Sequence, residues 1–180
     1  MPIEVEQVTV VRAEGRVLTD VIAAYDANER DLFTFALRVT RDGAAAEDIV
    51  QEAFLRLVRE SRAGRHPDNA RAWLYRVVVN LARTRARRRA VADRWRGLFA
   101  NRDVVRSPED DIVGREGANV LAALVASLPT DARMAFLLAS DGHSGQEVAS
   151  LMGRSEGATR NLLWRARREL RERMEREVTE

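Results

Sequence analysis

The chain has 180 residues, of which 46% are apolar and 32% are charged, a size and composition typical of a soluble protein with one domain or two small ones. It contains no cysteine, which excludes disulfides, thiolate nucleophiles and zinc fingers. No apolar run reaches the roughly 18 residues of a membrane span, and the first residues lack the basic and apolar segments of a secretory signal. We therefore expect a cytoplasmic protein without membrane insertion.

The charges are unevenly distributed along the chain. Every strongly basic side chain is an arginine, and arginines cluster at 83–89 and 165–173, whereas acids cluster at 47–60 and 108–116. Segregated charge of this kind indicates two different partners, one basic and one acidic. The fork of donors on arginine suits phosphate groups and base edges, although a GC-rich genome would also explain the absence of lysine.

The first part of the chain is predicted to be helical after a short extension. Residues 1–17 show only a weak alternation of apolar residues, which indicates a tail or a short extended segment. Helical periodicity begins at Leu18 and reaches a break at Asp42-Gly43. A further helix is expected over 44–59, and its outward face carries Glu47, Asp48, Gln51, Glu52 and Arg56.

A loop and a long basic helix come next. Gly64 and Pro67 predict a loop over 61–68, and Asp68 or Asn69 is expected to cap the helix that follows. At about 100° per residue, the helix at 69–89 has an apolar arc of Trp73, Leu74, Val77, Val78 and Leu81, with Arg76, Asn80, Arg83 and Arg87 along its edge. Because the apolar arc is needed for packing, the cations beside it favour nucleic acid over a membrane surface as the partner.

The chain then passes through a linker into a second helical region. The helical pattern can continue through 92–99, but Ser107-Pro108 and the acids after it indicate a linker. Periodicity returns at Ile112 and runs to Leu128, and another helix is expected from Asp131 to Asp141. We therefore predict an all-α fold in which an N-terminal extension, 1–17, precedes two small helical domains, 18–94 and 113–176, joined by a flexible linker, 95–112.

The second domain is predicted to end in a helix-turn-helix. Ser144 and Glu147 form a capping box that opens a short helix at 146–152. A three-residue turn, 153–155, leads to a long helix from 156 to about 175, which is the spacing of a helix-turn-helix. On this last helix we expect an inward arc of Ala158, Leu162, Leu163, Ala166 and Leu170 and a polar side of Arg160, Asn161, Trp164, Arg165, Arg168 and Arg171.

The tryptophan on the polar side of the last helix is informative. A large aromatic side chain that faces water usually marks a surface for a partner. Packing of Trp164 against a neighbouring helix is the alternative explanation.

The sequence offers little for catalysis. His66 and His143 are isolated, no metal-binding pattern surrounds them, and no lysine is present for a phosphate loop or a Schiff base. Acids on an exposed helical face, such as Asp48 and Glu52, are usually only solvated. We therefore expect a binding protein and not an enzyme, with no metal and no cofactor.

Three segments together resemble the bacterial RNA polymerase sigma factors of the extracytoplasmic-function (ECF) group, within the sigma-70 family. They are Ala-Glu-Asp-Ile-Val-Gln-Glu-Ala-Phe at 46–54, Ala-Trp-Leu-Tyr-Arg-Val-Val-Val-Asn-Leu at 72–81, and the final helix-turn-helix with Arg-Ala-Arg-Arg-Glu-Leu at 165–170. The resemblance covers about 18–173, and the first two segments, in this order and at this separation, are the most specific.

The resemblance implies a role for each polar face. Asp48, Gln51 and Glu52 would dock on the clamp helices of the polymerase beta-prime subunit. Asn80 would engage the minus-ten promoter element, with Arg76, Arg83 and Arg87 along the same edge, and the loop 61–69 would capture a flipped-out base through His66, Asn69 or backbone groups. The minus-thirty-five element would be read by Arg160, Asn161, Trp164 and Arg165, with Arg168 beside them. The polymerase beta flap and an anti-sigma factor would be further partners.

The expected function is therefore that of an alternative sigma factor, which binds core polymerase, recognises a promoter at two elements and helps to open it. One alternative is a free-standing regulator that binds duplex DNA through the final helix alone, but it leaves the acidic face at 47–52 unexplained. Another is a sigma-like decoy that sequesters an anti-sigma factor or polymerase without initiating transcription. The arginines at 83–89 argue against the decoy.

Overall fold

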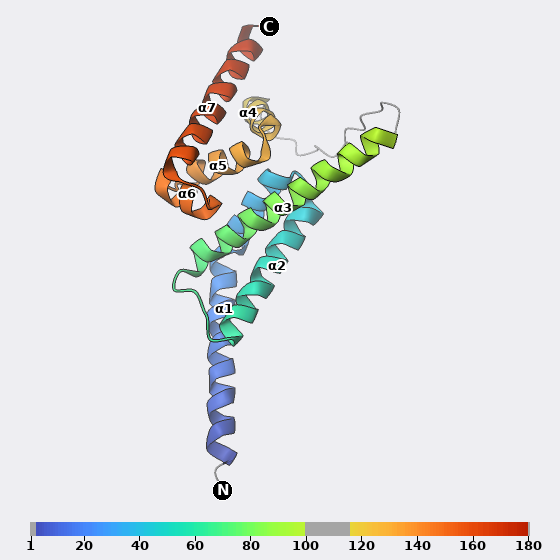
Figure 1. Cartoon of the computed structure of the whole chain (residues 1–180). Coiled ribbons are helices and arrows are strands. Elements are labelled where there is room, and N and C mark those ends of the chain that lie inside the picture. The colour runs from blue at the N-terminus through green and yellow to red at the C-terminus, as the bar shows by residue number, and fades with distance from the viewer. Residues whose placement is uncertain (1–2, 100–115, 180) are drawn as a thin grey trace. The chain divides into compact units, whose positions relative to one another are not determined.

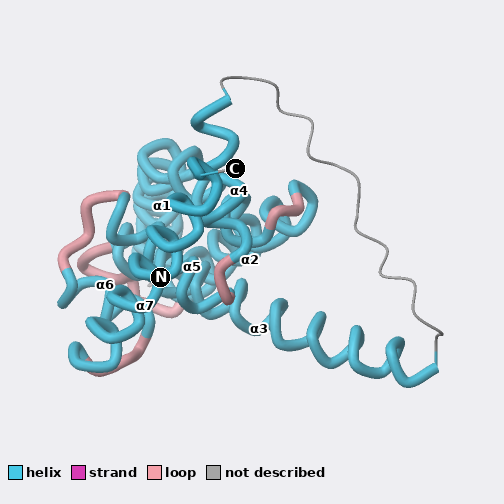
Figure 2. The backbone as a smooth tube through the Cα atoms, turned by 90° about the horizontal axis from the view of Figure 1, so that it is seen from above, coloured by secondary structure: helices cyan, strands magenta, loops and turns pink. Residues whose placement is uncertain are grey.

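The computed structural model describes residues 3–99 and 116–179, and within these ranges every regular element is an α-helix. The predicted all-α fold is thus confirmed. The helices are α1 (Ile3–Thr40), α2 (Gly43–Arg62), α3 (Ala70–Phe99), α4 (Glu116–Ser127), α5 (Thr130–Ser140), α6 (Gly145–Met152) and α7 (Glu156–Thr179) (Figure 1). The chain divides into two compact units, 1–82 and 83–180. Short loops connect α1 to α2, α2 to α3, α4 to α5, α5 to α6 and α6 to α7 (Figure 2).

The first unit is built on an antiparallel pair of long helices. Thr40 ends α1, Arg41 turns the chain with a positive φ of 58°, and Asp42 caps α2 by accepting a hydrogen bond from the Ala45 amide at 2.9 Å. The third helix closes the core, where the rings of Phe35 and Tyr75 lie 5.6 Å apart. Fully buried side chains from the three helices are Leu32, Phe35, Ala36, Ala46, Ala53, Leu57, Leu74, Tyr75, Val78 and Val79.

The N-terminal extension differs from the prediction. Residues 3–17 belong to α1 and are not extended, and α1 continues past the end of α2 (Figure 1). The weak alternation of apolar residues suggested a tail or a short extended segment, but an extended segment needs a partner strand for its backbone hydrogen bonds, and the residues that the structure describes offer none. Lengthening an existing helix adds one hydrogen bond per residue without the cost of a new nucleus, so the helix is the stable continuation.

Helix α3 begins where the sequence indicated and runs further. The Asn69 side chain accepts a hydrogen bond from the Ala72 amide at 2.9 Å, so Asn69 is the cap. The buried stripe is shifted from the predicted arc: Trp73, Val77 and Leu81 are half-buried, whereas Leu74, Tyr75, Val78, Val79 and Ala82 are buried. The helix ends at Phe99, and the rest of the predicted linker, like the expected helix start at Ile112, lies outside the described residues.

The second unit contains the predicted helix-turn-helix. Ser144 Oγ accepts from the Glu147 amide at 3.2 Å, and the Ser144 amide donates to Glu147 Oε2 at 2.7 Å, which confirms the capping box. Gly153 ends α6 in the left-handed conformation, with φ 60°. Ser155 then caps α7 by accepting from the Ala158 amide at 3.3 Å. The core of the unit includes Leu128, Met134, Leu137, Leu138, Val148, Met152, Leu163 and Leu170.

The inward side of α7 was predicted with an error at its start. Thr159 is fully buried, whereas Ala158 is exposed and Leu162 is half-buried. The buried stripe is therefore Thr159, Leu163, Ala166 and Leu170. A threonine was taken as polar and left out of the arc, although its methyl group packs well in a core. Among the described residues no helix is both long and apolar enough to cross a membrane.

Candidate nucleic-acid interface

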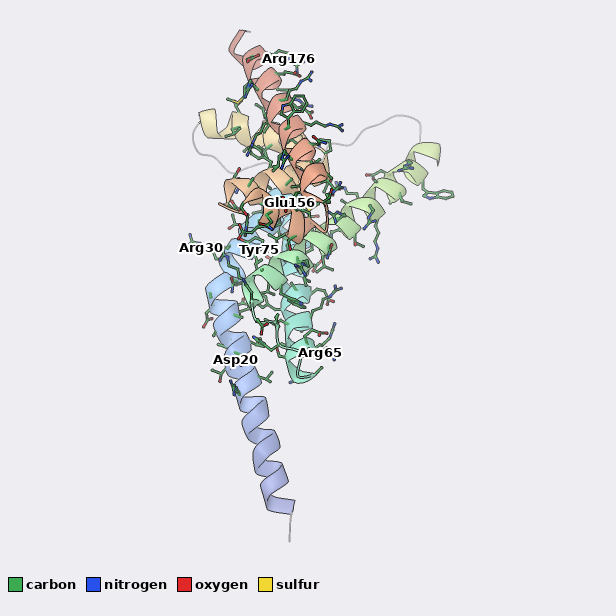
Figure 3. The ribbon with its side chains drawn as sticks, turned by 60° about the vertical axis from the view of Figure 1, so that its left-hand side comes forward. Asp20, Arg30, Arg65, Tyr75, Glu156 and Arg176 are labelled. Carbon is green, nitrogen blue, oxygen red and sulfur yellow. The ribbon has the colours of Figure 1, made fainter. Side chains whose placement is uncertain are left out.

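One side of α7 carries the polar side chains that the sequence singled out. Opposite the buried stripe lie Arg160, Asn161, Trp164, Arg165 and Arg168, and all five are exposed. Trp164 is 59% exposed, so it does not pack in the core as the alternative explanation required. Figure 3 shows side chains projecting from α7 along its length between the labelled Glu156 and Arg176. We call these five residues the α7 polar face.

The cations of the α7 polar face are not equivalent. The Arg168 guanidinium lies 5.4 Å from the centre of the Trp164 ring, and its Nε donates to Glu172 Oε1 at 2.7 Å. The hydrogen bond from Arg168 lowers the pKa of the Glu172 carboxyl and the same pair raises the pKa of Arg168. Among the described residues Arg160 and Arg165 have no acidic partner. Two cations are thus available to an anionic ligand, and one is held beside an indole.

The turn of the helix-turn-helix is tied to α5. Arg154, which precedes the α7 cap, donates to Asp131 Oδ2 in the first turn of α5. The same carboxylate accepts from Arg83 Nε at 3.0 Å, and Arg83 Nη1 donates to the Met152 carbonyl at 3.2 Å. Partial burial opposes the ionisation of Asp131, but the hydrogen bonds from Arg83 and Arg154 outweigh it and lower its pKa. The half-buried Arg83 is therefore engaged with protein groups in this structure.

The basic edge of α3 is largely exposed in the structure. Arg76, Asn80 and Arg87 all have exposed side chains, and they lie on the side of the helix away from Leu74 and Val78. Asn69 is exposed as well, but its carboxamide oxygen is already used in capping α3. A ligand can therefore reach this edge from solvent.

The loop before α3 holds its histidine in a defined state. His66 is exposed, and its Nδ1 lies 2.7 Å from the Oγ of the buried Ser61. Ser61 donates its hydroxyl hydrogen to the Leu57 carbonyl at 2.8 Å, so His66 Nδ1 must carry the hydrogen that joins it to Ser61. In a neutral ring the other nitrogen, Nε2, is then an acceptor. Close by, Arg65 donates to Glu60 at 2.8 and 3.1 Å, which lowers the pKa of Glu60 (Figure 3 labels Arg65).

The acidic face of α2 is partly neutralised by arginines on the same helix. Asp48 and Gln51 are exposed, but Glu52 accepts a hydrogen bond from Arg56 Nε at 2.8 Å and lies 3.6 Å from Arg59 Nη1. The hydrogen bond from Arg56 lowers the pKa of Glu52. No group of three or more histidine and acidic side chains in residues 3–99 and 116–179 could hold a metal ion.

The sequence analysis missed an apolar residue on this face. Leu55 is 52% exposed and lies one turn after Gln51. Its position on the helix, three residues after Glu52 and four after Gln51, could have revealed it.

A groove in the second unit was not predicted at all. It has a volume of about 630 Å³ and is lined by Leu121, Phe136, Arg167, Leu170, Arg171, Met174 and Glu175. These residues come from α4, α5 and α7, three helices that are separate in the sequence. Leu121 and Met174 are 44% and 45% exposed, which leaves an apolar surface with arginines at its rim.

A helix-turn-helix with an exposed arginine and tryptophan face, preceded by a unit with a second basic helix, defines an all-helical DNA-binding protein. The comparisons with known proteins identify its family. Residues 24–91 match the model of sigma-70 region 2, and residues 118–170 match that of sigma-70 region 4. The chain is 31% identical over 161 residues to the ECF RNA polymerase sigma factor SigL of Mycobacterium tuberculosis, covering 83% of this chain and 85% of SigL. The chain belongs to the ECF group of the sigma-70 family.

Two other relatives are considerably longer than this chain. It is 34% identical to the probable RNA polymerase sigma factor RfaY of Xanthomonas campestris pv. campestris, over 89% of this chain, and 34% identical to the ECF sigma factor SigJ of M. tuberculosis, over 82%. The matches span only 40% and 49% of those two proteins.

Solved structures share the fold. The sigma factor RpoE of Bartonella quintana, crystallised with the anti-sigma factor NepR, aligns with a TM-score of 0.62 at 22% identity, over 87% of this chain and 95% of RpoE. CnrH, in complex with the cytosolic domain of CnrY, aligns with a TM-score of 0.61 at 20% identity, over 93% of this chain and 96% of CnrH.

Proposed function

We propose that the chain is an alternative sigma factor, which binds core RNA polymerase, recognises a promoter at two elements and helps to melt the DNA. The observation that carries the proposal is the exposed α7 polar face on a helix-turn-helix whose buried stripe is fully used in packing. A second exposed basic edge, on α3, gives the chain another DNA contact outside the helix-turn-helix. Domains 18–94 and 113–176, with the linker 95–112, remain our proposed division, and the bacterial cytoplasm is the proposed location.

The minus-thirty-five element is the proposed ligand of the α7 polar face. The second helix of a helix-turn-helix lies in the major groove, where its N-terminal residues reach base edges. Arg160 and Arg165, which have no acidic partner among the described residues, would make the charged contacts, and Asn161 would pair with a base edge. Trp164, backed by Arg168, would pack against the DNA backbone or a base methyl group.

The minus-ten element is the proposed ligand of α3 and the loop before it. Arg76, Asn80 and Arg87 would follow the strand that separates, and a flipped-out base would enter the loop near His66 and Asn69. Removing a base from the stack costs a few kcal/mol, which contacts in the loop would have to offset. His66 Nε2, as an acceptor, suits a base that presents an amino group.

Core polymerase is the proposed partner of α2. An exposed strip of α2 consists of Asp48, Gln51 and Leu55, with Glu52 beside it. We assign this strip to the beta-prime clamp helices of core polymerase. The ion pairs of Glu52 with Arg56 and Arg59 are screened by solvent and therefore contribute little stability. A basic partner surface could replace them.

The groove of α4, α5 and α7 is the proposed seat of the polymerase beta flap. Its apolar lining of Leu121, Phe136 and Met174 lies on the unit that carries the α7 polar face, so a flap bound there would fix this face relative to polymerase. The complex of RpoE with the anti-sigma factor NepR supports an anti-sigma factor as a further partner of this chain.

Runoff transcription with purified core polymerase tests the proposed function. We expect transcripts from genomic DNA fragments only when chain and core are combined, and sequencing of their starts would give the promoter. Binding to core with no open promoter on any fragment would favour the decoy. Sequence-selective DNA binding without any affinity for core would favour the free-standing regulator.

A further inference from the structure

A glycine stands in the first turn of α7 without a reason inside the folded unit. Gly157 is the second residue of the helix, its φ is not in the left-handed region, and it is exposed. A Cβ built on it would meet no atom within 4 Å. Glycine is less stable than alanine in a helix because it loses more backbone freedom on folding. The free protein therefore gains nothing from glycine at this position.

The place of Gly157 on the helix indicates what it faces. The helix turns about 100° per residue. The side opposite the buried Thr159, Leu163 and Ala166 therefore carries four exposed residues, Gly157, Asn161, Trp164 and Arg168. Gly157 thus lies next to the α7 polar face, on the same side of the helix and one turn before Asn161. It also lies at the end of the helix that reaches furthest toward base edges in a helix-turn-helix.

Its neighbours on the helix have longer side chains. Arg160 and Asn161 project from the same turn, whereas Gly157 presents only its Cα. Glycine is the residue that allows a backbone to approach a ligand closely. A gap in a row of long side chains lets the helix backbone move toward the DNA at that point.

We propose that promoter DNA packs directly against the Cα of Gly157, which sets how deeply α7 enters the groove and so which base edges Arg160 and Asn161 reach. The inference rests on the proposed function, since it takes the α7 polar face as the DNA-binding surface. Gly157 is in this sense a positioning residue: it makes no polar contact of its own, and a methyl group there holds the helix away from the bases.

The test compares Gly157→Ala with Gly43→Ala in holoenzyme made from the full chain and core polymerase. Gly43 is also an exposed first-turn helical glycine with nothing within 4 Å of a Cβ, but it lies in α2, outside the α7 polar face. The probe is a duplex that wild-type holoenzyme has enriched from a random-sequence library. Enrichment by the wild type tests the proposed function, and the comparison of variants on the enriched duplex tests Gly157.

We expect Gly157→Ala to bind the duplex at least tenfold more weakly while its melting temperature equals or exceeds that of the wild type. Gly43→Ala should keep the affinity. The dependence of affinity on salt should keep its slope in both variants, because no cation is removed. Affinity of Gly157→Ala within twofold of wild type would overturn the proposal. So would a lower melting temperature, which would show that the position is not open, or a shallower salt slope, which would point to lost phosphate contacts.

Discussion

The exposed faces of α2 and α7 carry their charges in different arrangements. On α2 the acid Glu52 pairs with Arg56 and Arg59, which follow it on the same helix. Among the arginines of the α7 polar face only Arg168 is paired, with Glu172. Arg160 and Arg165 have no acidic partner among the described residues. An exposed pair four residues apart contributes little stability, but it fixes the direction of a side chain and reduces its charge. The α2 face is thus oriented before it meets a partner, whereas the α7 polar face keeps two arginines without an acidic partner among the described residues for its proposed DNA ligand.

Reversal of the acids on α2 should have the largest effect. We expect Asp48→Arg with Glu52→Arg to remove measurable binding to core polymerase, because like charges brought together across an interface cost several kcal/mol. Fluorescence anisotropy of the labelled chain with core would measure it. Asp20→Arg with Asp26→Arg changes the net charge equally at exposed positions of α1 and should leave the affinity unchanged. Equal loss in both variants would mean that net charge, not this face, drives docking.

Removal of Arg160 and Arg165, the two arginines of the α7 polar face without an acidic partner among the described residues, should have the second largest effect. Arg160→Ala with Arg165→Ala should weaken binding of holoenzyme to a cognate promoter by about a hundredfold or more, since each arginine contact with a base is worth about 1–3 kcal/mol. Filter binding at several salt concentrations would also show a shallower slope. Arg176→Ala, on the last turn of the same helix, is the matched control. A hundredfold loss in the control would remove the distinction between the two ends of α7.

The exposed tryptophan should have an intermediate effect. We expect Trp164→Ala to weaken promoter binding about tenfold, because base or backbone packing on an aromatic ring contributes about 1–3 kcal/mol. Its unfolding temperature should change little, since the side chain is 59% exposed. Circular dichroism melting would check this. Unfolding of the second unit by this change would show that the residue belongs to the core.

Release of Arg168 from its ion pair with Glu172 tests the difference between paired and unpaired cations most directly. Glu172→Gln removes the carboxylate that holds Arg168 at 2.7 Å, so α7 gains a free cation. We expect promoter affinity to rise about two- to fivefold at low salt, with a steeper salt dependence. Glu169→Gln, which removes the equivalent ion pair with Arg173 outside the α7 polar face, serves as the control, because Arg173 remains bound to Ser127 Oγ. A fall in affinity would mean that the pair is needed to position Trp164.

The smallest expected effect concerns the capping box before the helix-turn-helix. Hydrogen bonds from Ser144 lower the pKa of Glu147 in the folded chain, so its contribution to stability is present above the unfolded pKa and is lost as the pH falls through the folded one. Glu147→Gln should therefore reduce the melting temperature slightly at neutral pH, and the difference from wild type should shrink as the pH falls below the ordinary glutamate pKa of about 4.3. A difference that stays the same as the pH is lowered through the acid range would contradict an electrostatic role.

Local signals in the sequence predicted local structure well. The capping box of Ser144 and Glu147, the Asn69 cap and the turn at Gly153 depend on residues within a few positions of each other, and each is present in the structure. The face of a helix is harder to predict, because it depends on what packs against it. Thr159 and Tyr75 are buried by neighbouring helices although both carry a hydroxyl group, so the predicted arcs were shifted.

Features assembled from distant segments could not be predicted. The groove needs side chains from α4, α5 and α7 together, and no pattern within one helix indicates it. The state of the His66 ring depends on the buried hydroxyl of Ser61, which the sequence showed only as a loop residue. The sequence did not single out the exposed Leu55, because the burial of an apolar helical residue cannot be assigned until the partner helix is known.

The buried Thr159 has a consequence for how this chain can change over evolutionary time. Its Oγ1 has no hydrogen-bond partner among the described residues, and a buried hydroxyl without a partner lowers stability. Valine has the same shape without the hydroxyl, so one substitution would recover the loss while the backbone of α7 stays in place. Proteins that remain just above their stability threshold keep such reserves. The stability gained in the second unit by such a substitution would offset destabilising changes on the α7 polar face. Under the proposed function, this face is where a new promoter specificity would arise.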